Sequence, residues 1–477
     1  MLWHIVGREL FQQLNSLRFL FALLLIIFLM ILNAIGHIKQ YKTRQIEYRQ
    51  QVSTALERLE KNSDNLYNLV MRGPGGLNKQ PSKLAFCAQG SEDYLPTSVL
   101  GWSAGWSRSS PTYKVSGLWR LMYDVSPPIT GTDIFPTFLK IDWILIVSIV
   151  LSFLALVFAF DAISGEVERG TLRLTLSNAV ARGTVLVGKF LSILMSLGVV
   201  LLIGILMNLL LLSGTLQLNG QEWGRIVGVS VVSLIYLSVF IALGLFVSSL
   251  ANRSATSLVI LLLLWVIWVL LIPATFGTIL SGLNQPLSTQ DYKAQRSSQR
   301  KEITERYEAR GVYEHVPTRV RPPTDATVLW AEFLNEERRA DFRLNKEFLA
   351  ARTHQIQVAR EFNRISPTAI VQYAVESLAG TGFQRHLDFL KNAERYADAF
   401  NDFLIAADRA DPDSLHVPFV REGMSDKPVS FESIPKFQDS VRLGDAFKGA
   451  LLDVMLLLLF FVVLFATAHV SFQRKEI

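Results

Sequence analysis

The most regular feature of the chain is a series of long apolar runs separated by polar segments. The runs cover residues 19–36, 141–160, 190–212, 226–250, 257–279 and 449–470. A helix needs about 20 apolar residues to cross about 30 Å of hydrocarbon, so each run predicts a transmembrane span. The polar remainder consists of short links and two large insertions, 37–140 and 280–448.

The residues before the first run predict a helix of their own. Within residues 1–18, apolar side chains recur at steps of three and four and therefore share one helical face: Trp3, Val6, Leu10, Leu14 and Leu17. We expect an interfacial amphipathic helix, which lies at the boundary between lipid and water. The alternative is that these residues begin a longer first span. We expect no cleaved signal peptide, because the apolar run is too long and no small-residue cleavage site follows it.

The distribution of basic residues predicts the orientation. Lys and Arg concentrate in short cytoplasmic loops, whereas long domains cross the membrane largely regardless of charge. One side of the predicted spans holds most of the basic residues in short segments: Arg8, Arg18, Arg169, Arg173, Arg182, Lys189, Arg253, Arg474 and Lys475. The short loop 213–225 on the other side has only Arg225. We therefore expect both termini in the cytoplasm and both insertions outside.

Both insertions show helical patterns. Residues 38–70 have helical apolar spacing, which Gly73-Pro74-Gly75-Gly76 ends, and the rest of the first insertion predicts loops with short elements. In the second insertion, steps of three and four indicate the seam of packed helices at Ala340, Leu344 and Phe348, and at Leu390, Ala393, Ala397, Phe400, Leu404 and Ala407. The predicted fold class is mainly α, a six-span transmembrane helical bundle with a largely helical extracytoplasmic domain built from two insertions.

Composition adds few candidate sites. The formal net charge is +6, but the basic residues are mixed with acids and form no recognition motif, so we expect no nucleic-acid partner. The single cysteine, Cys87, cannot form an intrachain disulfide or a Cys-based zinc site. None of the 7 histidines stands at metal-ligand spacing. We predict no catalytic residue, no metal site and no cofactor on this chain.

The segment between the second and third runs has the most specific pattern. It reads DAISGEVERGTLRLTLSNAVARGTVLVGK over residues 161–189 and is too polar to lie in lipid. Its end fits the first seven positions of a phosphate-binding loop, but the eighth position needs Ser or Thr and is Phe190. We therefore expect ATP hydrolysis, if it drives this protein, on a separate subunit.

The same segment resembles the loop after the second span in permeases of type 2 ABC transporters (the ABC-2 class). The shared pattern is an aspartate, Ser-Gly-Glu, Glu-Arg-Gly-Thr-Leu, a Leu-Ser turn, an arginine and Gly-Lys. In that family the loop holds a coupling helix that docks on an ATP-binding subunit, which binds ATP and magnesium. The resemblance implies that the following residues contact this subunit: Glu166, Glu168, Arg169, Gly170 and Thr171. A short charged helix can transmit rigid-body movement between subunits through directional ion pairs.

The resemblance covers the whole order of parts, from the interfacial helix to the sixth span. Ser366-Pro367, Ala379-Gly380-Thr381 and a helical stretch with His386 and Tyr396 resemble a subfamily with large extracytoplasmic insertions. The leading hypothesis is therefore an exporter-like permease subunit in the bacterial cytoplasmic (inner) membrane. It would pair with a second permease, of the same or a related chain, and the insertions would gate the pathway, bind substrate or dock an extracytoplasmic partner protein. The alternative is a membrane-anchored sensor or scaffold with an extracytoplasmic ligand- or partner-binding domain.

A few polar residues stand inside or beside the spans. Asp142 and Asp453 lie near the ends of the second and sixth spans, where we expect capping or solvation rather than function. Asn208 lies within the third span, where it would either hydrogen-bond to another helix or line a pathway. Pro273 is expected to kink the fifth span near its outer end.

Overall fold

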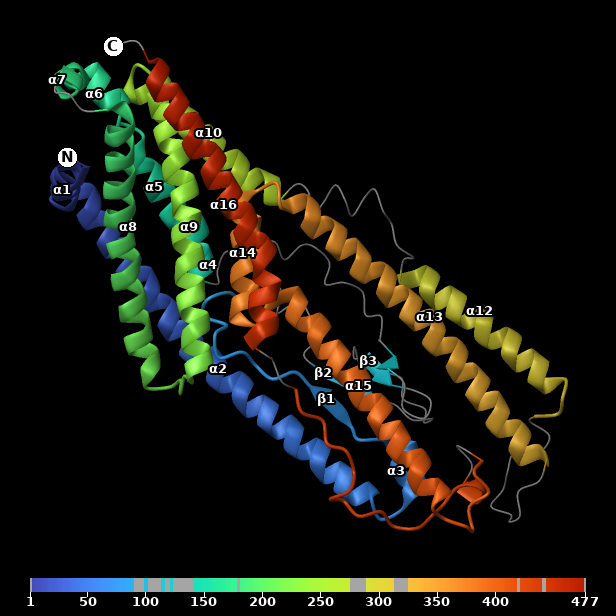
Figure 1. Ribbon diagram of the computed structural model, residues 1–477. Helices are drawn as coiled ribbons and strands as arrows, with labels where there is room; N and C mark the ends of the chain where they lie inside the picture. Colours follow the sequence, from blue (N-terminus) through green and yellow to red (C-terminus); the bar gives the residue numbers. More distant parts are fainter. Residues whose placement is uncertain are drawn as a thin grey trace.

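The computed structural model describes residues 2–89, 98–101, 113–115, 121–122, 141–177, 181–274, 289–312, 325–417, 421–439 and 443–475. It confirms the predicted fold class, a mainly α bundle (Figure 1). In this part of the chain, 6 helices are long and apolar enough to cross a membrane: Leu17–Asn62, Trp143–Glu168, Arg182–Ser213, Gly220–Leu250, Ser254–Ala274 and Ala446–Arg474. Both termini lie at one end of the bundle, the terminal end, and we name the opposite end the distal end (Figure 1).

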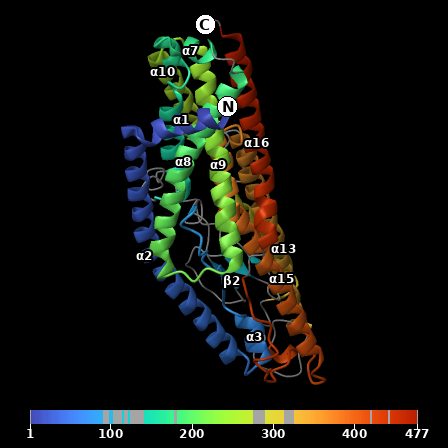
Figure 2. The same cartoon turned by 60° about the vertical axis from the view of Figure 1, so that its left-hand side comes forward.

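The chain begins with a short helix that is separate from the first span. Helix α1 (Leu2–Leu14) ends before Ser16, whose hydroxyl accepts a hydrogen bond from the Phe19 amide and caps the next helix. α1 lies across the other helices at the terminal end (Figure 2), and it buries Val6 while Trp3 remains exposed. The structure thus shows a separate helix rather than an extension of the first span, and its interfacial position stays a prediction.

The first span is part of a much longer helix than the sequence predicted. Helix α2 (Leu17–Asn62) contains both the predicted span 19–36 and most of the predicted helix 38–70 without a break. Residues 37–62 contain no proline or glycine, so nothing stops the helix where it leaves the apolar run. α2 therefore projects beyond the other spans at the distal end, and a short helix, α3 (Leu66–Arg72), follows it and ends at Gly73.

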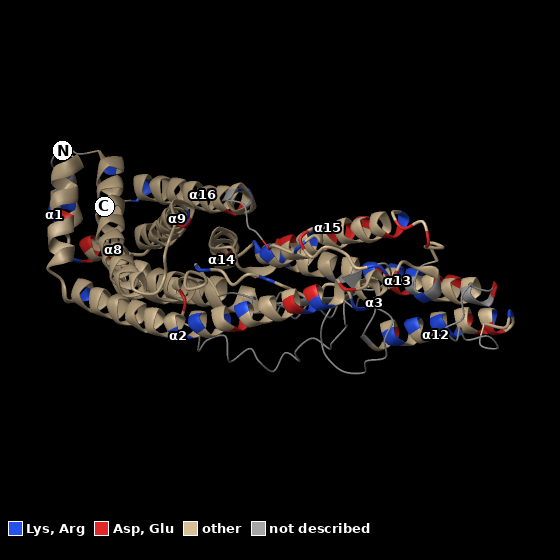
Figure 3. Cartoon of the chain, turned by 90° about the horizontal axis from the view of Figure 1, so that it is seen from below, with Lys and Arg blue, Asp and Glu red and all other residues tan. Residues whose placement is uncertain are grey.

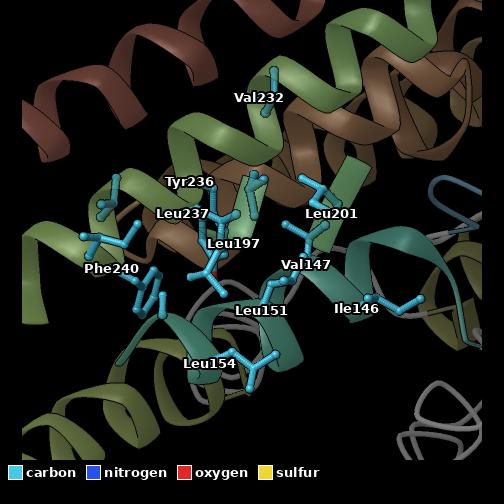
Figure 4. Close-up of a cluster of buried hydrophobic side chains, with 14 of the residues drawn as sticks. Ile146, Val147, Leu151, Leu154, Leu197, Leu201, Val232, Tyr236, Leu237 and Phe240 are labelled. Atoms are coloured by element: carbon cyan, nitrogen blue, oxygen red, sulfur yellow. The ribbon is translucent and has the colours of Figure 1, made fainter. Parts of the chain in front are cut away.

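The second, third and fourth spans form the core of the bundle. The second span consists of α4 (Trp143–Leu145), the π-helical segment η3 (Ile146–Leu151) and α5 (Ser152–Ala159), and the next two are α8 (Arg182–Ser213) and α9 (Gly220–Leu250). Their apolar side chains gather between the helices (Figure 4): Ile146, Val147, Leu151, Leu154, Leu197, Leu201, Val232, Tyr236, Leu237 and Phe240. A Cβ atom built on Gly244 would lie 2.4 Å from the Ala159 Cβ, so only glycine permits this contact between α5 and α9.

The fifth and sixth spans lie at the rim of the bundle. The fifth runs through α10 (Ser254–Trp265) and a π-helical segment, η4 (Val266–Leu271), and the sixth is α16 (Leu443–Arg474). The wide turns of η4 come just before Pro273, where we expected a kink, because proline lacks the N–H that would close the preceding turn. Both spans expose many of their apolar side chains, which a lipid environment or a partner would cover.

One segment of the second insertion belongs to the bundle core, whereas the sequence placed all of 280–448 outside it. Helix α14 (Pro367–Ala379) packs between α9 and α16 (Figure 1). At its start, Ser366 Oγ donates to the Trp268 carbonyl at 2.6 Å, and the hydroxyls of Thr368 and Tyr236 lie 3.0 Å apart. The helix is buried because it is apolar around most of its circumference: Ala369, Ile370, Val371, Ala374, Val375, Leu378 and Ala379.

The two aspartates beside the spans have different environments. Asp142 caps α4 as predicted, since its Oδ1 accepts from the Leu145 amide at 2.9 Å. The prediction for Asp453 was wrong: its side chain is 1% exposed, and its Oδ1 lies 2.7 Å from Arg364 Nε. Because a buried carboxylate needs a partner, this ion pair fixes the turn before α14 against the sixth span.

The distal end carries the charged part of the molecule. Lys, Arg, Asp and Glu side chains are frequent on the distal part of α2 and on three further helices (Figure 3), which are α12 (Thr289–Glu308), α13 (Asp325–Asn363) and α15 (Gly382–Arg409). The predicted seam of α15 is confirmed, because Leu390, Ala393, Ala397, Phe400 and Leu404 are buried in a cluster with α3. A short 3-10 helix, Arg421–Gly423, lies between α15 and α16.

A small sheet accompanies these helices. Its strands are β1 (Gly76–Asn78), β2 (Ser98–Gly101), β3 (Tyr113–Val115) and β4 (Leu121–Met122), in the order β1-β2-β3-β4. β1 and β2 are antiparallel, β2 and β3 parallel, and β3 and β4 antiparallel. These are the short elements expected in the first insertion.

Candidate functional site

The loop between the second and third spans forms two short helices at the terminal end. α6 (Ser164–Glu168) and α7 (Thr171–Ser177) are joined by Gly170, whose φ of 70° is a left-handed conformation that favours glycine. Residues 178–180 lie outside the described part of the chain. The turn at Gly170 separates two surfaces, one that faces the bundle and one that faces solvent.

The inner surface is held by backbone contacts to the fourth span. The amides of Ile163 and Ser164 both donate to the Ser248 hydroxyl of α9, each at 3.0 Å. The Ser248 hydroxyl in turn lies 3.2 Å from the Ser164 hydroxyl. These amides would otherwise be the unsatisfied donors at the start of α6, so Ser248 fixes the position of that helix.

Glu166, which the resemblance implies contacts another subunit, is only 20% exposed and has partners within the chain. Its Oε1 lies 2.7 Å from Lys189 Nζ, and the same ammonium lies 3.0 Å from Glu9 Oε1. The Lys189 side chain is 4% exposed. One buried cation therefore joins α1, α6 and α8, and a charge-assisted contact of this kind is stronger than a neutral hydrogen bond.

Glu168 is also engaged within the chain. Its Oε2 accepts from the Ser254 amide at 3.1 Å and from the Ser254 hydroxyl at 2.9 Å. Because Ser254 is the first residue of α10, the carboxylate occupies the amino-terminal end of that helix, where a negative charge is favourable. Glu168 itself remains exposed, so it caps the fifth span at the solvent-facing edge of the loop.

Two arginines attach the rest of the segment to further spans. Arg18 of α2 makes a two-pronged contact with Asp161, with nitrogen–oxygen distances of 3.2 and 2.9 Å. At the other end of the segment, Arg182 Nη1 donates to the carbonyls of Gln473 and Lys475, each at 2.8 Å, and so caps α16. We name the contacts of Asp161, Ser164, Glu166, Glu168, Arg182 and Lys189 the loop network. It connects the segment to α1, α2, α9, α10 and α16.

The outer surface of the loop is open. Arg169, Gly170 and Thr171 are exposed, and a Cβ atom added to Gly170 would meet nothing within 4 Å. Leu174 of α7 is 70% exposed, whereas its neighbour Leu172 is buried. The sequence analysis missed Leu174. The signal was available, because a helix cannot bury both leucines of Leu172-Arg173-Leu174 on one face.

Asn208 forms an interhelical contact at the distal end of α8. Its Nδ2 donates to the Met30 carbonyl at 2.7 Å and to Asn33 Oδ1 at 2.8 Å. Asn33 Nδ2 continues the chain of bonds to the Ile141 carbonyl at 2.7 Å. Of the two predicted roles, the structure shows the hydrogen bond between helices, and it buries the Asn208 side chain completely.

The apolar helices define a multi-pass membrane protein. Hydrogen bonds and ion pairs of the loop network connect its 161–189 loop to four of the other spans. The comparison with protein families agrees with the resemblance found in the sequence. A model for the ABC-2 family transporter protein matches residues 3–477, so the chain belongs to this family and is a membrane permease component of an ABC transporter. Membership implies association with an ATP-binding subunit. No curated protein gave a match.

Proposed function

We propose that the exposed surface of the 161–189 loop docks on the ATP-binding subunit and that the loop network carries the resulting movement into the spans. The observation that carries this proposal is the division of the loop into two surfaces. Glu166 and Glu168 contact other helices of the permease, and the outer side of the loop exposes Arg169, Gly170, Thr171 and Leu174 beside Glu168. An exposed leucine beside charged residues fits a protein contact, in which an apolar anchor supplies affinity and charges supply specificity.

The distribution of charge supports the orientation that goes with this docking. The loop and both termini share one end of the bundle (Figure 1), and the basic residues of the short segments belong to this end, so it is cytoplasmic by the positive-inside rule. The helices α12, α13 and α15 and the small sheet then form an extracytoplasmic domain. The membrane is the bacterial cytoplasmic (inner) membrane, as the resemblance implies.

The proposed transport cycle combines the docking surface of the loop with the loop network. Two permeases, of the same or related chains, pair in the membrane above two ATP-binding subunits, which bind ATP and magnesium. ATP binding draws these subunits together and moves each loop as a rigid body. Because the loop network joins the loop to five helices, the movement reaches the first, fourth, fifth and sixth spans together and changes which side of the membrane the pathway faces. The direction is export-like, which the resemblance alone supports.

Association of purified subunits tests the docking surface. The permease is co-expressed with its ATP-binding subunit, captured on a tag in mild detergent, and the captured ATPase is quantified. Thr171→Trp and Leu174→Asp change exposed positions and are expected to reduce captured ATPase at least about tenfold, since each alters a central contact. Lys391→Glu, an exposed position on α15, is the matched control and should leave capture unchanged.

The same experiment can overturn the proposal. Wild-type capture with no loss in either loop variant would move the docking surface elsewhere on the terminal end. Failure of the wild-type permease to capture any ATP-binding subunit would favour the alternative function, a membrane-anchored sensor or scaffold.

A further inference from the structure

A groove lies between the ends of the fourth and sixth spans at the terminal end. It has a volume of about 910 Å³ and runs between the last turn of α9 and the last two turns of α16. One wall is apolar and is formed by Phe246, Leu250, Ala466 and Val470. Leu250 and Val470 are both largely exposed, so nothing in the described part of the chain covers this wall.

The groove lies at the level where the spans end. In its lining, the Ser249 hydroxyl contacts the Ser471 hydroxyl at 2.7 Å and holds the two helices together. The preceding residue, Ser248, binds the amides of Ile163 and Ser164, where the second span gives way to the loop. The groove therefore opens at the boundary between the apolar spans and the polar loop, which is where lipid headgroups lie.

The rim of the groove is basic. Lys475 Nζ donates to the carbonyls of Ser249 and Ala251, each at 2.7 Å, and within the described part of the chain these partners are neutral. Arg474 is exposed at the same rim, and Asn252 adds a polar group. None of the described residues that line the groove is acidic. The described residues of the groove thus combine an apolar wall with a basic rim.

We propose that this groove binds an anionic phospholipid of the leaflet at the terminal end. An acyl chain would cover the apolar wall, and the phosphate would lie against Arg474 and Lys475. Basic pockets between spans recognise anionic headgroups through this combination of contacts. A zwitterionic lipid should bind less tightly, because the described lining residues offer no carboxylate for its ammonium group. The site does not depend on the docking of an ATP-binding subunit.

A bound lipid would stabilise a junction that the loop network also uses. Arg182 caps α16 only a few residues from the groove, through the carbonyls of Gln473 and Lys475. A lipid that bridges α9 and α16 would therefore restrain the sixth span relative to the loop. Lipid bound in the groove would therefore help the sixth span to move together with the loop.

Native mass spectrometry of the full chain in detergent tests the site with two probes, phosphatidylglycerol and phosphatidylcholine of identical acyl chains. We expect tighter binding of phosphatidylglycerol. Arg474→Gln should weaken phosphatidylglycerol about fivefold, as expected for one basic residue at a headgroup, and weaken phosphatidylcholine less, because its choline ammonium offsets the charge of its phosphate. Ala466→Trp should weaken both lipids because it fills the apolar part of the groove.

Matched controls separate the groove from general attraction to the protein. Arg173→Gln removes an exposed arginine of α7 at the same end, and Leu459→Trp enlarges an exposed apolar residue of α16 outside the groove. Both should leave the two affinities unchanged. The proposal is overturned by equal affinities for the two lipids, by equal losses in Arg173→Gln and Arg474→Gln, or by the absence of bound phosphatidylglycerol in permease dimers. The last result would show that a second copy covers the groove.

Discussion

Glu166 and Lys189, which stand 23 positions apart in the sequence, form a buried ion pair of 2.7 Å that closes the loop onto the third span. Glu9 joins the same ammonium from α1 at 3.0 Å. The carboxylates are 20% and 24% exposed, so solvent reaches one side of the triad while the lysine is enclosed. The described part of the loop is therefore bonded to the bundle rather than separate from it.

Removal of the cation should destabilise the terminal end. Lys189→Met leaves Glu9 and Glu166 close together without a partner. Removal of one member of a buried pair costs about 3–5 kcal/mol, and the partial exposure of both carboxylates places this case at the low end. Thermal unfolding in detergent should show a clear loss of stability for Lys189→Met and a smaller loss for Lys189→Arg. Equal melting of Lys189→Met and the wild type would contradict this account.

The contact between α5 and α9 depends on the absence of a side chain at Gly244. Gly244→Ala places a methyl group 2.4 Å from the Ala159 Cβ, and overpacking of this kind costs about 1–3 kcal/mol. The reciprocal variant, Ala159→Gly with Gly244→Ala, should recover much of the lost stability. Gly198→Ala is the control, since its Cβ would meet only Leu234 at 3.7 Å. Melting temperatures test this prediction. An equal loss of stability in Gly244→Ala and Gly198→Ala would contradict it.

The ion pair of Arg364 and Asp453 should behave as a coupled unit. Asp453→Asn leaves Arg364 with Glu361 as its remaining acidic partner, and Arg364→Gln leaves a buried carboxylate. The double variant removes both charges, so it should be less destabilised than the sum of the single variants by about 0.5–3 kcal/mol. A double-mutant cycle of unfolding free energies measures this coupling. Strictly additive effects would show that the pair contributes nothing beyond its separate side chains.

The junction of α14 and α15 should lose stability as the pH falls. Burial, with Lys79 and Arg385 nearby, lowers the pKa of His386 to about 3. In the unfolded chain this histidine has a pKa near 6.5, so between about pH 6.5 and pH 3 the unfolded state binds a proton that the folded state does not. Stability is thus complete above pH 6.5 and falls below it, by up to about 1.4 kcal/mol per pH unit.

The variant His386→Phe isolates this contribution. It keeps an aromatic ring beside Phe389 and removes the titrating group. Unfolding measured between pH 7.5 and pH 4 should therefore show a shallower loss for the variant than for the wild type. Identical pH dependence in the two proteins would exclude His386 as the source.

The sequence predicted the spans well because apolar length alone determines whether a helix can cross a membrane. It placed the end of the first span less well, since the charged residues after Ile35 favour helix as strongly as the apolar residues before it. The position of α14 was missed for a different reason. Its apolar residues between Ala369 and Ala379 are interrupted by Gln372 and Glu376 and cover too short a stretch to span a membrane, so the pattern suggests the core of an outer domain, although the helix packs among the spans.

The candidate site could be located from the sequence, but its two surfaces could not be separated. The resemblance grouped Glu166 with Gly170 and Thr171, because neighbouring residues of a short loop share one pattern. The partners of Glu166 and Glu168 are Lys189 and Ser254, which come from other helices, and no local spacing predicts such contacts. The buried partner of Asp453 was hidden in the same way, since Arg364 stands 89 positions before it.

The contact of the loop with the ATP-binding subunit is tested most directly by photo-cross-linking in membranes. A benzoylphenylalanine at position 171 or 174 replaces an exposed side chain of the loop, and the same group at position 391 of α15 is the control. The account predicts light-dependent adducts of one permease with one ATP-binding subunit from positions 171 and 174, and none from 391. Adducts from 391, or an associated ATP-binding subunit that cross-links to neither loop position, would contradict it.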